Sequence, residues 1–369
     1  MKTFSQKLLS TCLSIYEKNK RNRLLLSVLL ACSVIFEFLY KCRLNLYKRK
    51  ILKTTTLQTY IISLGNITSG GTGKTPLTIE IAKYFMNKDY KVAILCRGYN
   101  NPNTKVKEVV LVSDGSDILL DYDQCGDEPY LIATKVPKAL VFVGKNRVKS
   151  AKAAIKLGAQ VLILDDGFQY LKLHRNENVL MMDSYKPFDN GYLIPRGKLR
   201  EQNDSISRST AIILSNSDRA TITESDLSII KQYASNKPIL TIGYRIKEFT
   251  GLNTKRVLEI NKIKDLKVLA ICGIGNPESF IELLKLQGIN VTSSLIYPDH
   301  YNYEYKDMQE MVKEASKQNI EDIITTEKDG VKLEELCQAA PVNFWNTKLE
   351  VITTPNFYEN LFVNIKQLK

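Results

Sequence analysis

The stretch GNITSGGTGKTPLT, residues 65–78, decides how this chain folds. Its fourteen residues hold four glycines, four threonines and one lysine, and they directly follow the apolar run YIISL. Gly73-Lys74-Thr75 has the form of the end of a phosphate-binding loop, in which backbone N–H groups and a helix N-terminus surround phosphate oxygens. In such a loop Lys74 would reach the β- and γ-phosphates, and the Thr75 hydroxyl would ligate Mg²⁺.

The flanking sequence agrees with this interpretation. TYIISLG (59–65) is typical of a short buried strand, and PLTIEIAKYFMNK (76–88) has helical apolar spacing with a proline in its first turn. The strict pattern G-x-x-x-x-G-K-[ST] requires glycine where this chain has Thr68. An ordinary glycine-rich turn between strand and helix is the alternative.

A second segment has the properties of the strand that supplies acidic groups to such a site. VLILDDGFQY (161–170) places Asp165 and Asp166 directly after four apolar residues. This is the pattern of a Walker-B-like strand that ends beside the metal of a bound nucleotide. The alternative is a plain strand that ends in an Asx turn.

Composition is that of a globular chain. The 369 residues are enough for two domains, and 44% are hydrophobic and 25% charged. The seven cysteines are scattered without Cys-x-x-Cys spacing, which argues against a disulfide framework and a zinc site and favours a reducing compartment. They are Cys12, Cys32, Cys42, Cys96, Cys125, Cys272 and Cys337.

The positive charge is concentrated at the N-terminus. Of the net charge of +13, residues 1–53 carry +10, with twelve Lys and Arg against Glu17 and Glu37. The remaining 316 residues carry only +3, so the sequence does not predict a nucleic-acid-binding protein.

Between the basic clusters lies LLLSVLLACSVIFEFLY, Leu24 to Tyr40. Seventeen residues at ~1.5 Å each fall short of a ~30 Å hydrocarbon core, and Glu37 interrupts them. We expect a monotopic helix on an anionic membrane surface rather than a spanning one. The alternatives are a core helix and a lipoprotein-type leader, because Leu29 to Cys32 resembles a cleavage site that would place the body outside the cytoplasm.

The rest of the chain alternates strands and helices. Continuous apolar runs of the kind buried in parallel sheets are KVAIL, KEVVLV, KALVFV, VLIL, NVLMM, TAIIL, PILTI, KVLAI, INVTSSLI and EDIITT. NRVKSAKAAIKLG and PESFIELLKLQG lie between them as helices. This predicts a doubly wound α/β protein, resembling P-loop nucleotide-binding proteins, with a second, smaller α/β domain. We assign 1–53 to the N-terminal helical segment, 54–236 to the core and 237–369 to the smaller domain, with 241–253 as the strand that crosses over.

Taken in order, the motifs resemble one family. GNITSGGTGKTP, LCRGY, GDEPYLIA, DDGFQ, LIPRGKLRE, GIGNPESF, YPDHYNY and TTEKD are similar to motifs of the tetraacyldisaccharide 4'-kinases of lipid A biosynthesis. The apolar N-terminal helix is similar too, and the family's loop commonly lacks the first glycine, as here. One departure is Tyr170, where many members have histidine, so a ligand role for that side chain is in doubt.

The resemblance implies an enzyme of the cytoplasmic face of the bacterial inner membrane. It would use ATP and Mg²⁺ to phosphorylate the 4'-hydroxyl of a tetraacylated glucosamine disaccharide 1-phosphate. Its partners would be this lipid and the anionic membrane surface, without nucleic acid; the sequence favours a monomer without defining the oligomeric state.

The family's acid–base pair corresponds to Asp127 in GDEP and His300 in YPDHYNY, one of only two histidines. Taken alone, GDEP is typical of a turn and Asp299-His300 of a helix start. The other histidine, His174, we interpret as structural. A hairpin near 105–123 is expected to act as a lid.

Further roles follow from the same resemblance. Lys74 and Arg200 would neutralise charge on the transferred phosphate, and Arg147 is either a site residue or a solvated helix start. Metal-side ligands would be Asp165 first, then Thr75, Asp166 and Glu128. Nucleotide contacts would come from Ser69, Gly70, Gly71, Thr72, Gly73, Lys74, Thr75, Gln169 and Glu201.

Two hypotheses of other classes remain open. A different P-loop enzyme would explain the loop and the acidic strand but not GDEP, PDHY or the N-terminus. A membrane-surface adaptor without activity would explain the N-terminus alone.

Overall fold

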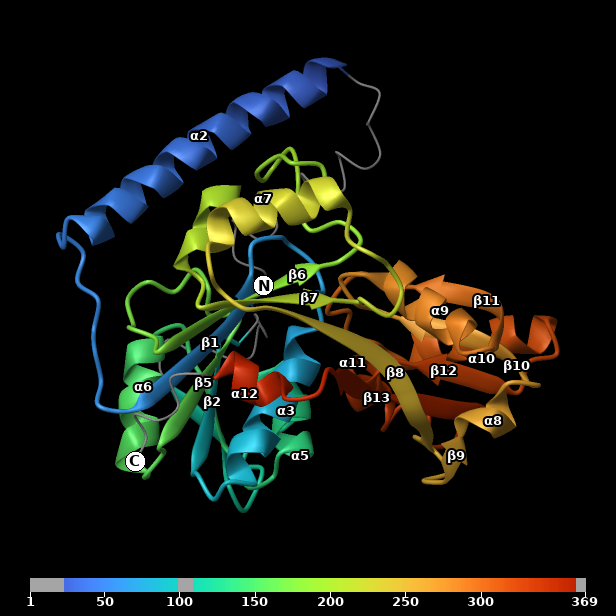
Figure 1. Ribbon diagram of the computed structural model, residues 1–369. Helices are drawn as coiled ribbons and strands as arrows, with labels where there is room; N and C mark the ends of the chain where they lie inside the picture. The colour runs from blue at the N-terminus through green and yellow to red at the C-terminus, as the bar shows by residue number, and fades with distance from the viewer. Residues whose placement is uncertain (1–22, 99–108, 363–369) are drawn as a thin grey trace. The chain divides into compact units, whose positions relative to one another are not determined.

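The computed structural model describes residues 23–98 and 109–362, which form two compact units (Figure 1). The second unit is Tyr244–Ile352, and the first contains the other described residues. The sequence predicted a smaller domain that continues to the C-terminus. Instead, residues 353–362 belong with the first unit, because α12 (Phe357–Leu361) stacks Tyr358 on Tyr84 with ring centroids 4.3 Å apart.

The first unit is built on a mostly parallel sheet in the order β8-β7-β6-β1-β5-β2-β4-β3. The pairs from β8 to β4 are parallel, and only β3 is antiparallel. Strands β1 and β5 at its centre are buried along their whole length, as their apolar runs predicted. The strands are β1 (Tyr60–Asn66), β2 (Val92–Cys96), β3 (Val110–Asp114), β4 (Leu140–Val143), β5 (Val161–Asp165), β6 (Glu177–Asp183), β7 (Ala211–Ser215) and β8 (Ile239–Gly251).

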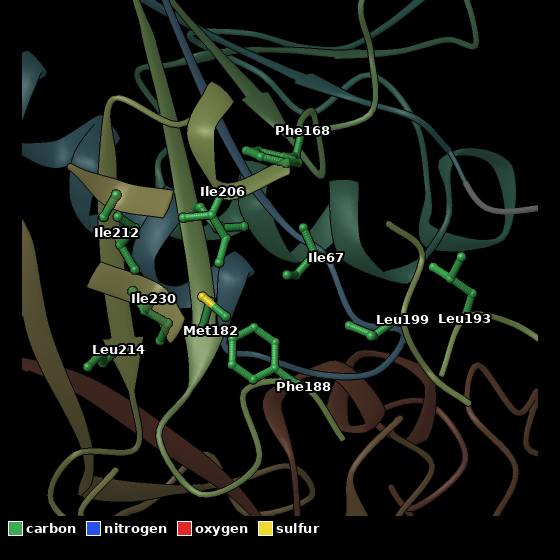
Figure 2. Packing of buried hydrophobic residues seen from close by; sticks show 12 residues of the cluster. Ile67, Phe168, Met182, Phe188, Leu193, Leu199, Ile206, Ile212, Leu214 and Ile230 are labelled. Atoms are coloured by element: carbon green, nitrogen blue, oxygen red, sulfur yellow. The ribbon is translucent and has the colours of Figure 1, made fainter. Parts of the chain in front are cut away.

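Helices cover both faces of this sheet, with α7 on one side and α3 on the other (Figure 1). Figure 2 shows the apolar cluster under α7, in which Ile230 packs with Met182 and Ile212. Phe168 and Ile67, from the turns after β5 and β1, belong to the same cluster, so the candidate site rests directly on the core. The helices of this unit's body are α3 (Lys74–Met86), α4 (Tyr122–Cys125), α5 (Asp127–Lys135), α6 (Arg147–Lys156), the 3₁₀ helix η1 (Asn203–Arg208) and α7 (Glu224–Ala234).

The hairpin expected near 105–123 is only partly correct. Its first half is β3, but β3 pairs with β4, and the second half contributes only an isolated bridge between Ser113 and Ile118. The polar side chain of Asp114 closes the turn by accepting from the backbone of Ser116 and Asp117. Residues 99–108, which include part of the predicted lid, lie outside the described residues.

Helix α2 (Arg23–Lys48) is 26 residues long, nine more than the apolar stretch that predicted it. Leu29, Ser33, Phe36 and Tyr40 recur every three or four residues along one side, which is helical spacing. Leu29 and Ser33 are buried, Phe36 packs on the cluster of Figure 2, and Ser33 Oγ donates to the Leu193 carbonyl at 2.8 Å. The helix is therefore attached to the body of the first unit along this stripe.

The second unit has its own sheet in the order β11-β10-β12-β13, continued by β8. β10, β11, β12 and β13 are parallel, and β9 pairs antiparallel with the end of β8. Trp345, the only tryptophan of the chain, is buried on β13 and donates its ring N–H to Asp322 at 2.7 Å. The elements are β9 (Val257–Glu259), α8 (Ile260–Ile263), β10 (Lys267–Cys272), α9 (Pro277–Leu286), β11 (Asn290–Ile296), α10 (Tyr305–Lys317), β12 (Asp322–Thr325), α11 (Glu327–Leu333) and β13 (Asn343–Thr353).

Candidate active site

The glycine-rich loop runs from the end of β1 into the first turn of α3, as the sequence predicted. Gly73 precedes the helix with φ of 77°, a left-handed conformation that glycine adopts without steric strain. At Gly65 a Cβ would lie 2.6 Å from the Phe168 Cβ, so glycine is required where β1 approaches the turn after β5. The two glycines thus have different tasks: one shapes the loop and the other lets the acidic turn lie close to it.

Thr68 lies where the strict motif has glycine, and its backbone explains the difference. The loop pairs with the chain before Arg200: Ser69 N donates to the Lys198 carbonyl and Arg200 N to the Ile67 carbonyl, both at 2.6 Å. Thr68 and Leu199 form the antiparallel bridge between them. A β-branched residue suits such an extended position, so threonine is compatible with the loop.

Asp165 and Asp166 lie at the carboxyl end of β5, next to β1 in the sheet. Asp166 has φ of 50°, and its carboxylate is held by two cations. Arg200 Nη1 lies 3.0 Å from each of its oxygens, and Lys74 Nζ lies 3.6 Å from Oδ1. Residues from three separate predicted motifs therefore meet at one carboxylate.

The charge state of Asp166 is set by these cations. Burial alone would raise its pKa, but Arg200 and then Lys74 outweigh burial and hold the pKa of Asp166 well below its usual range. Asp166 is therefore ionised at neutral pH, and it orients both Lys74 and Arg200.

Asp165 has the opposite environment. Burial, and next the negative charge of Glu128, raise the pKa of Asp165 to about 7, although Lys74 opposes the shift. The buried hydroxyl of Thr78 donates to Asp165 Oδ1 at 3.2 Å. Asp165 is thus a buried carboxyl group that would ionise fully when a cation binds beside it.

Arg147 is buried at the start of α6, so the solvated helix start that the sequence left open is wrong. Its guanidinium donates to the carbonyl oxygen of Asp165 at 2.8 Å and to that of Gly144 at 3.2 Å. It fixes the backbone that carries Asp165.

Other side chains of the loop have unused acceptors or hydroxyls. Asn66 donates to Thr72 at 3.2 Å, and Gln169 donates to the Asn66 carbonyl at 2.9 Å. Within the described part of the chain, the buried Asn66 Oδ1 and Ser69 Oγ have no hydrogen-bond partner. Buried polar atoms without partners fit a loop that receives a polar ligand such as a phosphate.

The residues present fit a magnesium ion as well as a nucleotide. No group of three or more His, Cys, Asp or Glu that could hold a metal occurs among residues 23–98 and 109–362. Mg²⁺ does not need such a group, since it is usually held by one or two carboxylates, waters and substrate phosphates. Asp165, with the Thr75 and Thr78 hydroxyls on the adjoining helix, is an oxygen donor set of this kind.

Asp127 and Glu128 begin α5, so the turn expected for GDEP is instead a helix N-terminus. Asp127 is buried, and its carboxylate accepts from the Glu128 backbone N–H at 2.9 Å. A carboxylate in the first helical turn is stabilised by the helix dipole. Asp127 and Glu128 belong to the first unit, with the loop and both aspartates of β5.

His300 lies in the second unit, in the loop after β11. It is not a helix start, because α10 begins at Tyr305 with Glu304 as its N-cap. Lys328 Nζ lies 3.2 Å from His300 Nε2 and 3.1 Å from Asp299 Oδ1. Since an ammonium can only donate, Nε2 accepts and the ring proton is on Nδ1 in this arrangement.

Glu201 is buried, and Tyr40 and Arg208 both donate to its Oε2. The predicted contact of Glu201 with a nucleotide stays a prediction. His174 is exposed on the segment after β5, where its backbone N–H donates to Thr55.

Thr78 is the site residue that the sequence analysis missed. It lies one helical turn after Lys74, on the same side of α3. This spacing of four residues in the predicted helix could have indicated that its hydroxyl lies at the site.

Together, the loop after β1, its lysine and the paired carboxylates at the end of β5 define a phosphate-loop enzyme that uses a nucleotide. A family model described as tetraacyldisaccharide-1-P 4'-kinase matches residues 25–366. The chain belongs to this family, and the resemblance drawn from its motifs is confirmed.

Individual relatives agree. The chain is 34% identical to the tetraacyldisaccharide 4'-kinase of Pelobacter propionicus over 90% of both chains, and 36% identical to that of Halothermothrix orenii over 84% of both. A crystal structure of LpxK from Aquifex aeolicus in complex with ATP is similar with a TM-score of 0.73 and 28% identity. That match covers 94% of this chain and 100% of the other, which confirms the predicted fold class.

Proposed function

We propose that this protein transfers the γ-phosphate of ATP to the 4'-hydroxyl of a tetraacylated glucosamine disaccharide 1-phosphate. Family membership supports the reaction, and one observation carries its chemistry: Lys74 and Arg200 converge on Asp166 beside the glycine-rich loop. Two cations held in place by a carboxylate are preorganised to meet charge on a transferring phosphoryl group.

In this mechanism the loop binds the phosphates and the cations neutralise them. The backbone around Ser69 to Thr75 surrounds the β- and γ-phosphates, with Lys74 beside them. Arg200 opposes the charge that develops on the γ-phosphate during transfer. Asp166 keeps both side chains oriented before the substrate arrives.

We propose that Asp165 and Thr75 hold magnesium, with Asp166 and Glu128 as further ligands. When bound, this ion would neutralise charge on the β- and γ-phosphates. The raised pKa of Asp165, about 7, means that its carboxyl would release a proton on binding the ion.

The acceptor hydroxyl must lose a proton as it attacks. We propose that Asp127 and His300 act together as its base, the carboxylate orienting the imidazole. In this pair the Nδ1–H would donate to the carboxylate. Nε2, which accepts from Lys328 in the structure, would have to exchange Lys328 for the acceptor hydroxyl in order to take its proton.

The test of the reaction is incubation with γ-labelled ATP and the disaccharide 1-phosphate. We expect the label on the lipid at the 4'-position, which mass spectrometry of the isolated product locates. Label released only as inorganic phosphate, or transferred elsewhere on the lipid, would contradict the proposal.

We further propose that the protein works at the cytoplasmic face of the bacterial inner membrane. Helix α2 is the only helix of the described residues that is long and apolar enough to cross a membrane. One side of it is attached to the first unit, whereas Leu24, Phe38 and Leu39 on the other side are more than half exposed. An amphipathic attachment of this kind suits a helix lying in the interface, with its basic neighbours on anionic headgroups.

Extraction distinguishes the modes of attachment. A helix held by charge and shallow burial is expected to be loosened by high salt and released by alkaline carbonate, whereas a spanning helix resists both. Removal of residues 1–53 is expected to abolish turnover of the lipid while ATP binding is retained. Resistance to carbonate, or a lipid on Cys32, would overturn the monotopic and cytoplasmic assignment.

A further inference from the structure

Helix α2 has polar contacts with the two loops that carry the candidate catalytic groups. These contacts come from its attached side, through Tyr40 and Arg43. They are separate from the exposed apolar side that we propose to face the membrane.

Tyr40 takes part in a partly buried three-residue network. Its hydroxyl donates to Glu201 Oε2 and accepts from Arg208 Nη1 at 2.9 Å. Arg208 also donates to Glu201, and its guanidinium lies 4.9 Å from the ring centroid of Phe168. Glu201 is only 1% exposed, so these two donors replace the water that a surface carboxylate would bind.

The network lies one and two residues along the chain from the candidate catalytic groups. Glu201 follows Arg200, whose guanidinium holds Asp166, and Phe168 lies two residues after Asp166. The segment that carries Arg200 and the segment that carries Asp166 therefore each contact the network that contains Tyr40.

Arg43 makes a second connection, one helical turn further along α2. Its guanidinium donates to the carbonyl oxygen of Gln169 at 3.2 Å. Gln169 in turn donates through its side chain to the carbonyl oxygen of Asn66, at the end of β1. One residue thus separates α2 from the strand that leads into the phosphate loop.

We infer that Tyr40 and Arg43 are positioning residues, through which the membrane-bound helix holds Arg200 and the loop of Gln169 in their productive places. This inference rests on the proposed kinase function and deepens it. It assigns α2 a part in the chemical step in addition to attachment. A small displacement of a group that must meet a transition state lowers the rate far more than it lowers ground-state binding.

Tyr40→Phe tests the first connection, because it removes one hydroxyl and keeps the ring. We expect kcat to fall about 10- to 100-fold, with KM for ATP unchanged. Flotation with vesicles of zwitterionic and anionic phospholipid should equal that of wild type. The matched control is Tyr47→Phe, the same change seven residues along the helix, which should leave kcat unchanged.

Arg43→Gln tests the second connection against Lys41→Gln. Both remove one positive charge from α2, but Lys41 is exposed and pairs only locally with Glu37 at 2.6 Å. We expect a fall in kcat for Arg43→Gln and not for Lys41→Gln. Equal losses in both would assign the effect to membrane charge and overturn the role of Arg43.

The outcomes separate this inference from the proposed function. If wild type does not phosphorylate the lipid, the proposed function fails and the inference with it. If wild type is active and Tyr40→Phe matches it in kcat, only the inference is overturned. A variant that loses flotation or ATP affinity together with kcat would assign Tyr40 to attachment or folding, which also overturns the inference.

Discussion

The two units each present loops at the carboxyl ends of parallel strands, but they use their polar groups differently. At the edge formed by β1 and β5, buried acceptors of Asn66 and Ser69 have no protein partner among the described residues, and the pKa of Asp165 is raised to about 7. At the edge formed by β10 and β12, Asp329 is fully buried and is held by two donors and a cation of the same unit, although the buried Thr325 Oγ1 has no hydrogen-bond partner among the described residues. Gly273 N and Thr326 donate to its Oδ2, and Lys332 pairs with Oδ1 at 3.2 Å.

The difference shows which edge is prepared for a ligand. At the first edge the buried carboxyl group of Asp165 has a raised pKa, which a bound cation would lower. At the second edge the buried carboxylate of Asp329 already has two donors and a cation, so it can hold a loop in place. His300 N donates to the Gly273 carbonyl at 3.2 Å, and Gly273 is the residue that Asp329 binds. The second edge is therefore a support for His300.

The largest expected effect is on kcat, and it concerns Asp127 of the first unit and His300 of the second. If Asp127 and His300 act as one base, Asp127→Ala and His300→Ala should each lower kcat by about 10²- to 10⁴-fold, with little change in ATP affinity. The double variant should be scarcely slower than the slower single variant, because groups that act as a unit are non-additive. Steady-state kinetics of the four proteins measures this. Multiplicative losses would show that the two residues act independently.

Lys74→Ala addresses the first edge alone. Its ammonium offsets charge on the transferring group, and its loss should lower kcat by roughly 10²- to 10³-fold. The control is Lys83→Ala on the same helix, where the lysine pairs with Glu80 near the surface. Near-normal kcat for Lys74→Ala would show that the loop does not act in the transfer.

Asp329→Ala addresses the second edge. Removal of the carboxylate takes the opposite charge from the buried Lys332, which still donates to the Tyr301 carbonyl at 2.9 Å, and takes the acceptor from the Gly273 N–H. The free energy of unfolding should therefore fall by about 3 kcal/mol. Urea denaturation followed by circular dichroism measures the change. Glu321→Ala, an exposed carboxylate of the same unit, should change it little. A stable Asp329→Ala protein would mean that this edge is not held by its buried charge.

The smallest effect concerns pH. The pKa of Asp165 is raised above the ordinary value of ~3.9, so the folded protein binds the proton more tightly than the unfolded chain. This group's contribution to stability is full below about pH 4 and is lost as pH rises through about 7. Asparagine does not titrate, so Asp165→Asn should remove this loss of stability. Without nucleotide or Mg²⁺, the free energy of unfolding of the variant relative to wild type should therefore rise by about 2 kcal/mol between pH 5 and pH 8.

Thermal unfolding at the two pH values measures this gain. Thr78 can still donate to the asparagine oxygen, so packing is kept. An equal difference between the two proteins at both pH values would mean that Asp165 does not titrate in this range.

The sheet was largely predictable from the sequence. All ten apolar runs proposed as strands overlap strands of the structure. Most of them are buried parallel strands, which need continuous apolar runs, but β3 is antiparallel and β11 is exposed at alternate residues. β13 was missed, since NFWNTKLEVIT mixes polar and apolar residues on a strand that is only partly buried. The hairpin was only partly correct because strand runs do not specify their partners, and β3 pairs with β4.

The sequence predicted which residues lie in the candidate site better than it predicted which of them contact one another. The loop motif and DDGFQ gave Lys74, Asp165 and Asp166 from local pattern. The pairing of Asp166 depends on Arg200, which is 34 residues away from it in the chain. The raised pKa of Asp165 depends on burial and then on Glu128, which the local pattern does not place beside it. Likewise, nothing in LIPRGKLRE indicates that Glu201 accepts from Tyr40, 161 residues before it.

The single tryptophan has a practical consequence. Trp345 lies in the second unit and the first unit has none, so indole emission excited beyond tyrosine absorption reports on one half of the fold alone. Its hydrogen bond to Asp322 and its burial on β13 are lost when that half opens, which should shift the emission to the red. Backbone dichroism reports on both halves. If the two signals change together, the halves unfold as one cooperative body, and if they separate, the gap between them measures how independently each half melts.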